Sequence, residues 1–322
     1  MRFSSAGESV ALDTELPWAG RLLERAVGTG PDPGPAASTG EPTVRIVIEA
    51  ATGPFDRAGL RPVTRGTYSD GRRTVLADAG GSGFDLQITA DDQLGVVARY
   101  RPSPAVRAAN RALRRRFGLL AGQVLVHYPV LWRAGWRGRV PLHASVLSAG
   151  GVTPLIAGPG GVGKSTVLVR ALAAGATATA DNICCADESS CHGLAEPIRT
   201  DAAGAQGART SHGRVELPLT HRVARLVPDR VVVLERGPRT EIEPAVPELA
   251  VRALSAGTYA AGELRRYWAF AATLALATGR GPAHPPISEV ASSYAARLPC
   301  LRVRVGDGAA VSIADMCAEV AV

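Results

Sequence analysis

The chain has 322 residues, of which 46% are hydrophobic and 20% are charged, and this is enough for two domains that each bury an apolar core. The longest uncharged run, Val140 to Gly163, is broken by prolines and glycines, and acidic residues interrupt the N-terminal segment, so we expect neither a membrane-spanning helix nor a secretory signal. Five cysteines, an odd number, give no disulfide framework, which predicts a protein of the reducing cytoplasm.

The charge is unevenly distributed along the chain. Residues 1–92 carry 9 basic and 13 acidic side chains, residues 93–180 carry 12 basic and no acidic ones, and residues 181–322 carry 15 and 16. A long segment without a carboxylate should create a positive field that attracts phosphate groups or an acidic partner. Compositional drift toward arginine is the alternative, but drift does not explain the missing acids.

Residues 1–120 are predicted to form a small β-rich domain. A short helix is expected at Pro17–Ala26, and the proline- and glycine-rich segment 31–42 has the composition of a linker. Apolar alternation predicts strands at Thr43–Glu49, Thr74–Ala77, Phe84–Ile88 and Gly95–Arg101.

Helices that begin at residue 104 mark the end of this domain. Residues 104–118 are predicted to form one helix, and a second helix covers part of 119–134. Spacings of three or four place four arginines on one face of the first helix: Arg107, Arg111, Arg114 and Arg115. A solvated face is the simplest interpretation, and a docking surface for an acidic peptide is the functional alternative. Nucleic acid is not expected, because no aromatic platform or reading motif accompanies the arginines.

Residues 121–322 are predicted to form an α/β domain. Strands at Leu142–Ser148 and Val152–Ala157 are joined by a hairpin at 149–151, and a glycine-rich loop leads into a helix from Lys164 to Ala174 that Gly175 ends. The remaining expected elements are strands at Thr177–Cys185, Val231–Leu234 and Leu301–Val305, and helices at Glu263–Thr278 and Ile287–Arg297.

The glycine-rich loop, Gly158 to Ser165, has the sequence GPGGVGKS and fits the pattern G-x-x-x-x-G-K-[ST]. Glycines let backbone N–H groups converge on phosphate oxygens, and the helix that follows directs its positive end at the same anion. Lys164 is the only lysine among 36 basic residues, which indicates a task that a guanidinium cannot perform. The residues predicted to bind ATP are Gly158, Pro159, Gly160, Gly161, Val162, Gly163, Lys164, Ser165 and Thr166.

Two further residues stand at characteristic distances from this loop. His143 precedes Lys164 by 21 residues, and Asp181 follows it by 17. With these spacings, residues 139–184 resemble the C-terminal catalytic domain of the HPr kinase/phosphorylase family. The LHAS and ADN segments are most similar to the HPr-kinase-like enzymes of peptide natural-product clusters, including those of lasso peptides. The resemblance implies a P-loop HPr-kinase-like catalytic domain, preceded here by the smaller β-rich domain.

The resemblance also implies an activity and a set of roles. The expected reaction is ATP-dependent transfer of the γ-phosphate to a serine-type hydroxyl of a peptide or protein, with Mg²⁺. Lys164 would hold the phosphates, Ser165 would hold Mg²⁺, and Asp181 would act as the base or as a ligand to Mg²⁺. His143 would hydrogen-bond Asp181 or the γ-phosphate. Kinases of this family form oligomers, so a homo-oligomer is expected.

This chain departs from the family pattern at two places. Asn182 stands where a second aspartate is usual, and the long signature segment that follows the catalytic aspartates in HPr kinase/phosphorylases is not recognisable. The resemblance therefore extends to phosphorylation of a hydroxyl but not to phosphorolysis or to HPr as the acceptor. A kinase for a small metabolite and a non-catalytic ATP-binding regulator, which Asn182 favours, remain as alternatives.

Other polar residues have weaker signals. Glu188 could replace the missing metal ligand, and Arg236, after an apolar strand, could clamp a phosphate; a solvated loop acid and an ordinary strand-end arginine are the alternatives. Cys185, Cys191 and His192 fit no common zinc spacing. Moreover, Cys184 and Cys185 are adjacent on a strand and should point to opposite faces.

Overall fold

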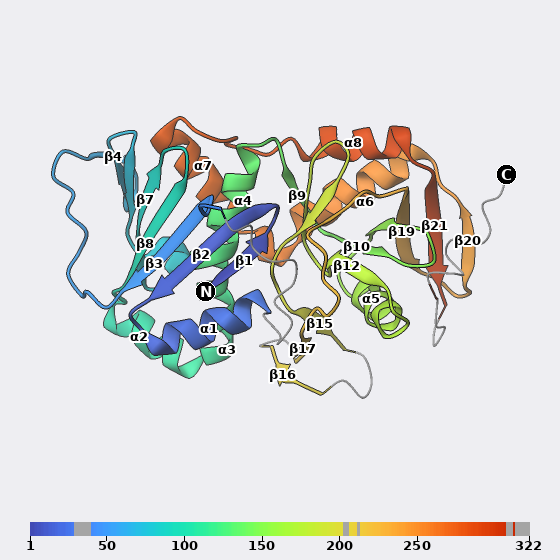
Figure 1. Ribbon diagram of the computed structural model, residues 1–322, viewed down its shortest axis with the longest axis horizontal. Coiled ribbons are helices and arrows are strands. Elements are labelled where there is room, and N and C mark those ends of the chain that lie inside the picture. The colour runs from blue at the N-terminus through green and yellow to red at the C-terminus, as the bar shows by residue number, and fades with distance from the viewer. Residues whose placement is uncertain (29–39, 202–205, 211–212, 307–311, 313–322) are drawn as a thin grey trace.

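The computed structural model describes residues 1–28, 40–201, 206–210, 213–306 and 312. The chain is mixed α/β, as the sequence predicts, and its two large sheets lie side by side along the long axis of the molecule (Figure 1). Of the predicted linker 31–42, residues 31–39 lie outside the described residues. Among the described helices, none has the length and apolar character needed to cross a membrane.

The N-terminal sheet has eight strands in the order β1-β2-β3-β8-β7-β6-β5-β4. Strands β2, β3 and β8 run parallel, and the other neighbours are antiparallel. The bounds are β1 (Arg2–Ser5), β2 (Glu8–Thr14), β3 (Val44–Glu49), β4 (Arg61–Thr64), β5 (Thr67–Ser69), β6 (Arg73–Leu76), β7 (Phe84–Ala90) and β8 (Leu94–Tyr100). The four predicted strands correspond to β3, β6, β7 and β8, and no predicted strand corresponds to the other four.

Four helices follow or flank this sheet: α1 (Pro17–Val27), α2 (Pro104–Ala112), α3 (Arg114–Gly122) and α4 (Tyr128–Gly135). A π-helical turn, Gln123–His127, connects α3 to α4. The prediction of one continuous helix over 104–118 is wrong, because Leu113 adopts φ −111° and ψ 49° and separates α2 from α3. The four arginines of interest therefore lie on two consecutive helices.

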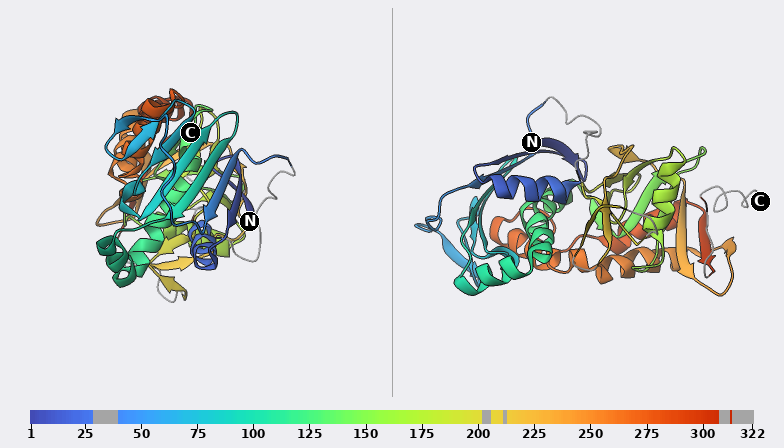
Figure 2. Two further views of the ribbon diagram at one scale, coloured as in Figure 1. Left: turned by 90° about the vertical axis from the view of Figure 1, so that its left-hand side faces the viewer. Right: turned by 90° about the horizontal axis from the view of Figure 1, so that it is seen from below.

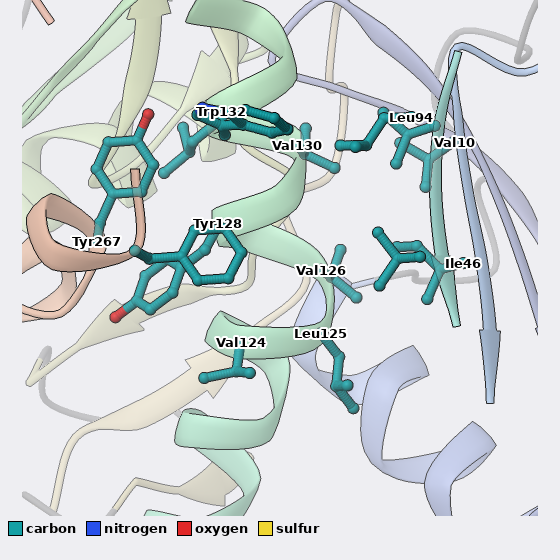
Figure 3. Packing of buried hydrophobic residues seen from close by; sticks show 14 of the residues in the cluster. Val10, Ile46, Leu94, Val124, Leu125, Val126, Tyr128, Val130, Trp132 and Tyr267 are labelled. Atoms are coloured by element: carbon teal, nitrogen blue, oxygen red, sulfur yellow. The ribbon is translucent and has the colours of Figure 1, made fainter. Parts of the chain in front are cut away.

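The first hydrophobic core lies between the eight-stranded sheet, the helical segment 123–135 and α7 (Tyr267–Thr278). Every residue of α4 is buried, as expected of a helix that is covered on all sides. Figure 3 shows Val126 and Val130 directed toward the sheet residues Ile46 and Leu94, with Tyr267 on the other side of the helix. The predicted boundary at residues 120/121 falls inside this helical layer, and the division into 1–120 and 121–322 stays a prediction.

The second large sheet has six strands in the order β12-β10-β11-β19-β21-β20. Its strands are β10 (Ala144–Ser148), β11 (Pro154–Ala157), β12 (Thr177–Ala180), β19 (Arg230–Arg236), β20 (Glu241–Pro244) and β21 (Cys300–Val305). Helix α5 (Lys164–Ala173) packs on one face, and α6 (Pro247–Ala260) and α8 (Ile287–Arg297) pack on the other (Figures 1 and 2). The sheet is thus covered by helices on both sides, with the glycine-rich loop at one edge.

Two small sheets join these layers. One contains β18 (Arg225–Leu226), β14 (Cys191–Gly193), β13 (Cys184–Ala186) and β9 (Val140–Leu142), and the other contains β15 (Ile198–Thr200), β17 (Val215–Leu217) and β16 (Ala208–Arg209). The expected strand Thr177–Cys185 is wrong as a single element, because the chain leaves β12 at Asp181 and enters a different sheet at Cys184. Asp and Asn favour such turns, since their side chains compete with strand hydrogen bonds.

Candidate phosphate-loop site

The loop between β11 and α5, Gly158 to Ser165, is shaped by its glycines, and we call it the phosphate loop. Gly158, Gly161 and Gly163 have φ values of 151°, 81° and 116°. A Cβ atom on Gly158 would lie 2.5 Å from the carbonyl oxygen of Leu234 on the neighbouring strand β19. Only glycine fits there, because the left-handed region is strained for other residues and the backbone approaches so closely.

The phosphate loop presents donors and a cation around one point. Among the described residues, no acceptor pairs with the amide N–H groups of Gly161, Gly163 and Lys164. The Lys164 ammonium donates to the carbonyl oxygens of Gly158 at 2.8 Å and Pro159 at 3.3 Å. Burial lowers the pKa of Lys164 to about 8, although Asp181 and Glu263 favour its charged form. A helix N-terminus with free N–H groups and a lysine is suited to an anion.

Asp181 reaches this edge of the sheet from another strand. Strand β12 is antiparallel to β10, and β10 is antiparallel to β11, so β12 and β11 both end at the same edge. The expectation that the strand of Asp181 lies beside the phosphate-loop strand is wrong, since β10 separates them. The carboxylate nevertheless lies near the loop, where the side chains of Ser165 and Lys164 both favour its ionised form.

The Asp181 carboxylate is buried and incompletely satisfied. The residue is 2% exposed, and its Oδ2 atom accepts a hydrogen bond from the backbone N–H of Arg199 at 3.1 Å. Its Oδ1 atom has no hydrogen-bond partner among the described residues. Burial raises the pKa of Asp181, against the opposing effects of Ser165, Arg199 and Lys164. A buried oxygen without a partner costs free energy, and this one is available to a proton or a cation.

His143 lies between β9 and β10 at the same place but does not contact Asp181 directly. Its Nε2 atom is 3.0 Å from Oδ1 of Asn182, and its Nδ1 atom is 3.1 Å from the carbonyl oxygen of Gly257 on α6. The expected hydrogen bond to Asp181 is therefore replaced by one to the next residue. Burial and the nearby Lys164 lower the pKa of His143 to about 4, so the ring is neutral at physiological pH.

A cavity of about 450 Å³ opens between the phosphate loop and α6. Its walls include His143, Asn182 and the first three residues of the loop on one side, and α6 residues from Leu249 to Ala260 on the other. Four charged lining residues were not predicted: Arg214, Glu235, Arg252 and Glu263. They come from segments 50 to 100 residues beyond Lys164, and no spacing in the sequence marks them.

Arg199 connects Asp181 to a buried glutamate that the sequence analysis also missed. The Glu196 carboxylate is 3.2 Å from the Arg199 guanidinium, and it accepts a hydrogen bond from the N–H of Ile183 at 3.1 Å. Burial raises the pKa of Glu196 to about 7. These contacts fix the chain on both sides of the Asp181–Asn182 turn.

The weaker candidates lie elsewhere. Glu188 is exposed in the turn between β13 and β14, and Arg236 is exposed at the end of β19, where side-chain alternation directs its neighbour Glu235 to the cavity instead. Cys184 and Cys185 do point to opposite faces, because they belong to different hydrophobic cores. Among the described residues, no group of histidines, cysteines and acids is arranged to hold a metal ion.

The residues present fit a nucleoside triphosphate together with one divalent cation. The phosphates of the nucleotide would themselves supply part of the cation's ligands. The free loop N–H groups and Lys164 suit phosphates, whereas the unpartnered Oδ1 atom of Asp181 and the Ser165 hydroxyl are the oxygen ligands that Mg²⁺ prefers. No protein-family model matches the chain, and no curated protein is significantly similar to it.

Proposed function

We propose that the protein is an ATP-dependent kinase of the HPr-kinase-like type, which transfers the γ-phosphate to a serine-type hydroxyl of a peptide or protein. One observation carries this proposal: a buried carboxylate oxygen without a partner, on Asp181, lies beside the lysine and serine of a phosphate loop that borders a cavity. A carboxylate at this position can hold Mg²⁺, and in a kinase it can also take the proton of the acceptor hydroxyl.

The chain's own residues would act as follows. Lys164 and the loop N–H groups hold the phosphates and balance the charge that builds up on the γ-phosphoryl group. The Asp181 carboxylate takes the proton from the acceptor hydroxyl as its oxygen forms a bond to the γ-phosphorus. The bond from that phosphorus to the bridging oxygen breaks, and ADP leaves with the electron pair. Mg²⁺, held by Ser165 and Asp181, would supply further charge neutralisation.

Burial supports the assignment of the base. The raised pKa of Asp181 makes its carboxylate a stronger proton acceptor than an exposed aspartate, while Ser165, Arg199 and Lys164 favour its ionised form. His143 and Asn182 would act as positioning residues, since their contact holds the turn that carries Asp181. The neutral ring of His143 also adds no positive charge that would compete with Lys164.

Intact-mass analysis tests the proposal. The full-length protein, Mg²⁺ and ATP are incubated in parallel with serine-containing peptides, free serine and a set of sugars, and the Asp181→Asn variant serves as the control. A phosphoryl group gained by a peptide with the wild type and not with the variant supports the proposal. Phosphorylation of only a free metabolite would establish the small-molecule alternative. ATP binding without transfer to any acceptor would establish the regulator.

A further inference from the structure

We propose that a groove between α1 and the α2–α3 helices binds an acidic, extended segment of the peptide acceptor. The groove has an outer section of about 660 Å³ and an inner section of about 260 Å³, and Leu22 and Arg114 line both. We call it the arginine groove. That the bound peptide is the acceptor rests on the proposed kinase function. That the groove binds an acidic peptide at all does not depend on that function.

The outer section has an apolar floor. Trp18, Tyr100 and Phe117 line it and pack against one another, with ring centroids 5.1 to 6.2 Å apart. All three rings are only partly buried, because α2, which covers this side, has no buried residue of its own. Partly exposed aromatic rings at the bottom of a groove can receive one large apolar side chain of an extended peptide.

The rim of the groove is strongly basic. Eight arginines and two glutamates line the two sections together. Both glutamates are already paired, Glu49 with Arg99 at 2.7 Å and Glu216 with Arg25 at 2.6 Å. In contrast, six of the eight arginines form no ion pair with any residue that the structure describes: Arg21, Arg107, Arg111, Arg114, Arg115 and Arg209. An exposed set of unpaired like charges favours an anionic partner. Four of these arginines belong to residues 93–180, the segment that has no carboxylate.

The inner section shares one residue with the surroundings of Asp181. Arg199 lines this section with its side chain, while its backbone N–H donates to the Asp181 carboxylate. The three-stranded sheet that carries Arg199 lies directly beside α1 and α3 (Figure 1), and the Arg25–Glu216 pair joins the two. A peptide bound along the inner section would therefore pass over Arg199, the residue whose backbone N–H donates to the Asp181 carboxylate.

The composition of the groove favours a peptide over nucleic acid. The three aromatic rings contact one another in tilted or edge-on arrangements, so they do not offer parallel open faces on which successive bases could stack. An extended peptide alternates its side chains with a period of two, which allows an apolar residue on the floor and acidic residues at the rim.

Fluorescence anisotropy with the full-length protein tests this inference without ATP. The probe is a labelled peptide of about 12 residues that contains Glu and Ser and one central Leu, and a second probe replaces every Glu with Gln. The Arg111→Gln/Arg114→Gln variant should bind the Glu peptide about tenfold more weakly than the wild type. Arg61→Gln/Arg116→Gln is the matched control, because it removes two exposed arginines that do not line the groove. The control should stay within about twofold of the wild type.

Three results would overturn the inference: equal loss of affinity in both double variants, equal binding of the Glu and Gln peptides, or tighter binding of a labelled oligothymidylate through Arg111 and Arg114. Calorimetry with ATP, run on the same variants, should show unchanged affinity and so establish that they are folded. Groove-dependent binding without any phosphoryl transfer would overturn the proposed kinase function alone. Transfer to peptides that does not depend on Arg111 and Arg114 would overturn the groove alone.

Discussion

Buried carboxylates in the two large sheets differ in their partners. In the N-terminal sheet, the side chain of Glu8 is inaccessible to solvent and lies 3.0 Å from the guanidinium of Arg139. Asp85 in the same sheet lies 2.5 Å from Arg101. At the edge of the second sheet, Asp181 is equally buried, yet it forms no ion pair with any described residue. Glu8 and Asp85 are each paired with an arginine, whereas Asp181 is not, although Glu8 and Asp181 each keep one carboxylate oxygen without a hydrogen-bond partner among the described residues.

This difference separates structural from functional charge. A buried acid that has an arginine partner is stable where it is, and removal of either group leaves the other uncompensated. A buried acid without a partner lowers the free energy of unfolding, and such groups persist where chemistry needs them. Glu8 should therefore matter for stability and Asp181 for turnover.

The largest effect is expected at Lys164. Lys164→Ala should abolish turnover, and Lys164→Arg should lose about 10³-fold or more, the scale of a cation that stabilises the transferred phosphoryl group. The arginine keeps the charge, but it is larger than the ammonium, which is buried between the loop carbonyls of Gly158 and Pro159. Steady-state kinetics measures the loss, and Arg170→Lys on the exposed face of α5 is the control. Near-normal turnover of Lys164→Arg would contradict the inference that this position needs an ammonium group which a guanidinium cannot replace.

Asp181→Asn keeps the shape of the side chain and removes its charge. Because general-base help is worth about 10²–10⁴-fold, kcat should fall by that factor while ATP affinity stays within a few-fold of the wild type. Single-turnover kinetics measures the rate of phosphoryl transfer, and calorimetry measures the affinity for ATP. Transfer at the wild-type rate would show that Asp181 is not the base.

The same variant has an expected effect on stability with a definite sign. Burial raises the pKa of Asp181 in the folded state above its ordinary value of 3.8, so the folded protein holds this proton at a pH where the unfolded chain has released it. The contribution of Asp181 to the free energy of unfolding therefore decreases as the pH rises above 3.8. Asp181→Asn should unfold at a higher denaturant concentration than the wild type at pH 7, with a smaller gain near pH 4. A destabilised variant at pH 7 would mean that Asp181 is a structural charge like Glu8.

Glu8→Gln should give the opposite result. Its removal leaves the Arg139 guanidinium, which is 13% exposed, without its carboxylate, and breaking a buried pair costs about 3–5 kcal/mol of unfolding free energy. Asp13→Asn on the same strand is the matched control, since its pair with Arg45 is 3.8 Å long and more than half exposed on both sides. The control should cost less than about 1 kcal/mol. Denaturant unfolding measures both, and equal costs would remove the contrast between the two kinds of carboxylate.

Local sequence signals predicted much of the fold but not its layers. The phosphate loop, α1, α5, α8 and the central strands follow from glycines, caps and apolar periodicity that lie within about a dozen residues. Helix α6 was missed, because its buried positions, Ala250, Leu254 and Thr258, form too weak an apolar stripe. Helix α4 has no polar face, so only the structure shows that it is enclosed by the sheet and α7. The break at Leu113 has no glycine or proline to mark it.

In the candidate site, too, local sequence signals indicate some residues and not others. Lys164 and Ser165 are fixed by the motif, and Asp181 is suggested by its distance along the chain. The partners that shape its surroundings are not, because they reach the site through tertiary packing. Thr258 on α6 accepts a hydrogen bond from the backbone of His143, 115 residues away in sequence. Glu263 and Arg214 reach the cavity in the same manner. Such contacts have no local pattern from which to predict them.

The smallest effect is expected at Asn182, the position that departs from the resembled family. Asn182→Asp places a carboxylate about where the Asn182 amide now lies, 3.0 Å from the His143 ring, whereas Asp181 is held by a different residue, Arg199. Because Asp181 keeps its own contacts, kcat should stay within a few-fold of the wild type, and the Mg²⁺ concentration needed for half-maximal turnover should fall. A loss as large as that of Asp181→Asn would mean that the Asn182 amide itself takes part in transfer.

A second consequence of Asn182→Asp concerns acid stability. In the wild type, the pKa of His143 is about 4 in the folded state against 6.5 in the unfolded chain, so the unfolded chain takes up this proton first and stability falls as the pH drops from 6.5 toward 4. A carboxylate beside the ring favours its charged form and raises the pKa of His143, so the variant should lose less unfolding free energy between pH 7 and pH 5 than the wild type does. The gain should vanish in the double variant His143→Gln/Asn182→Asp, because no ring remains to titrate. If the single variant showed the wild-type pH dependence, the contact between residues 143 and 182 would have no electrostatic role. The contacts of Asp181 with Arg199, Ser145 and Ser165 would then have to position it.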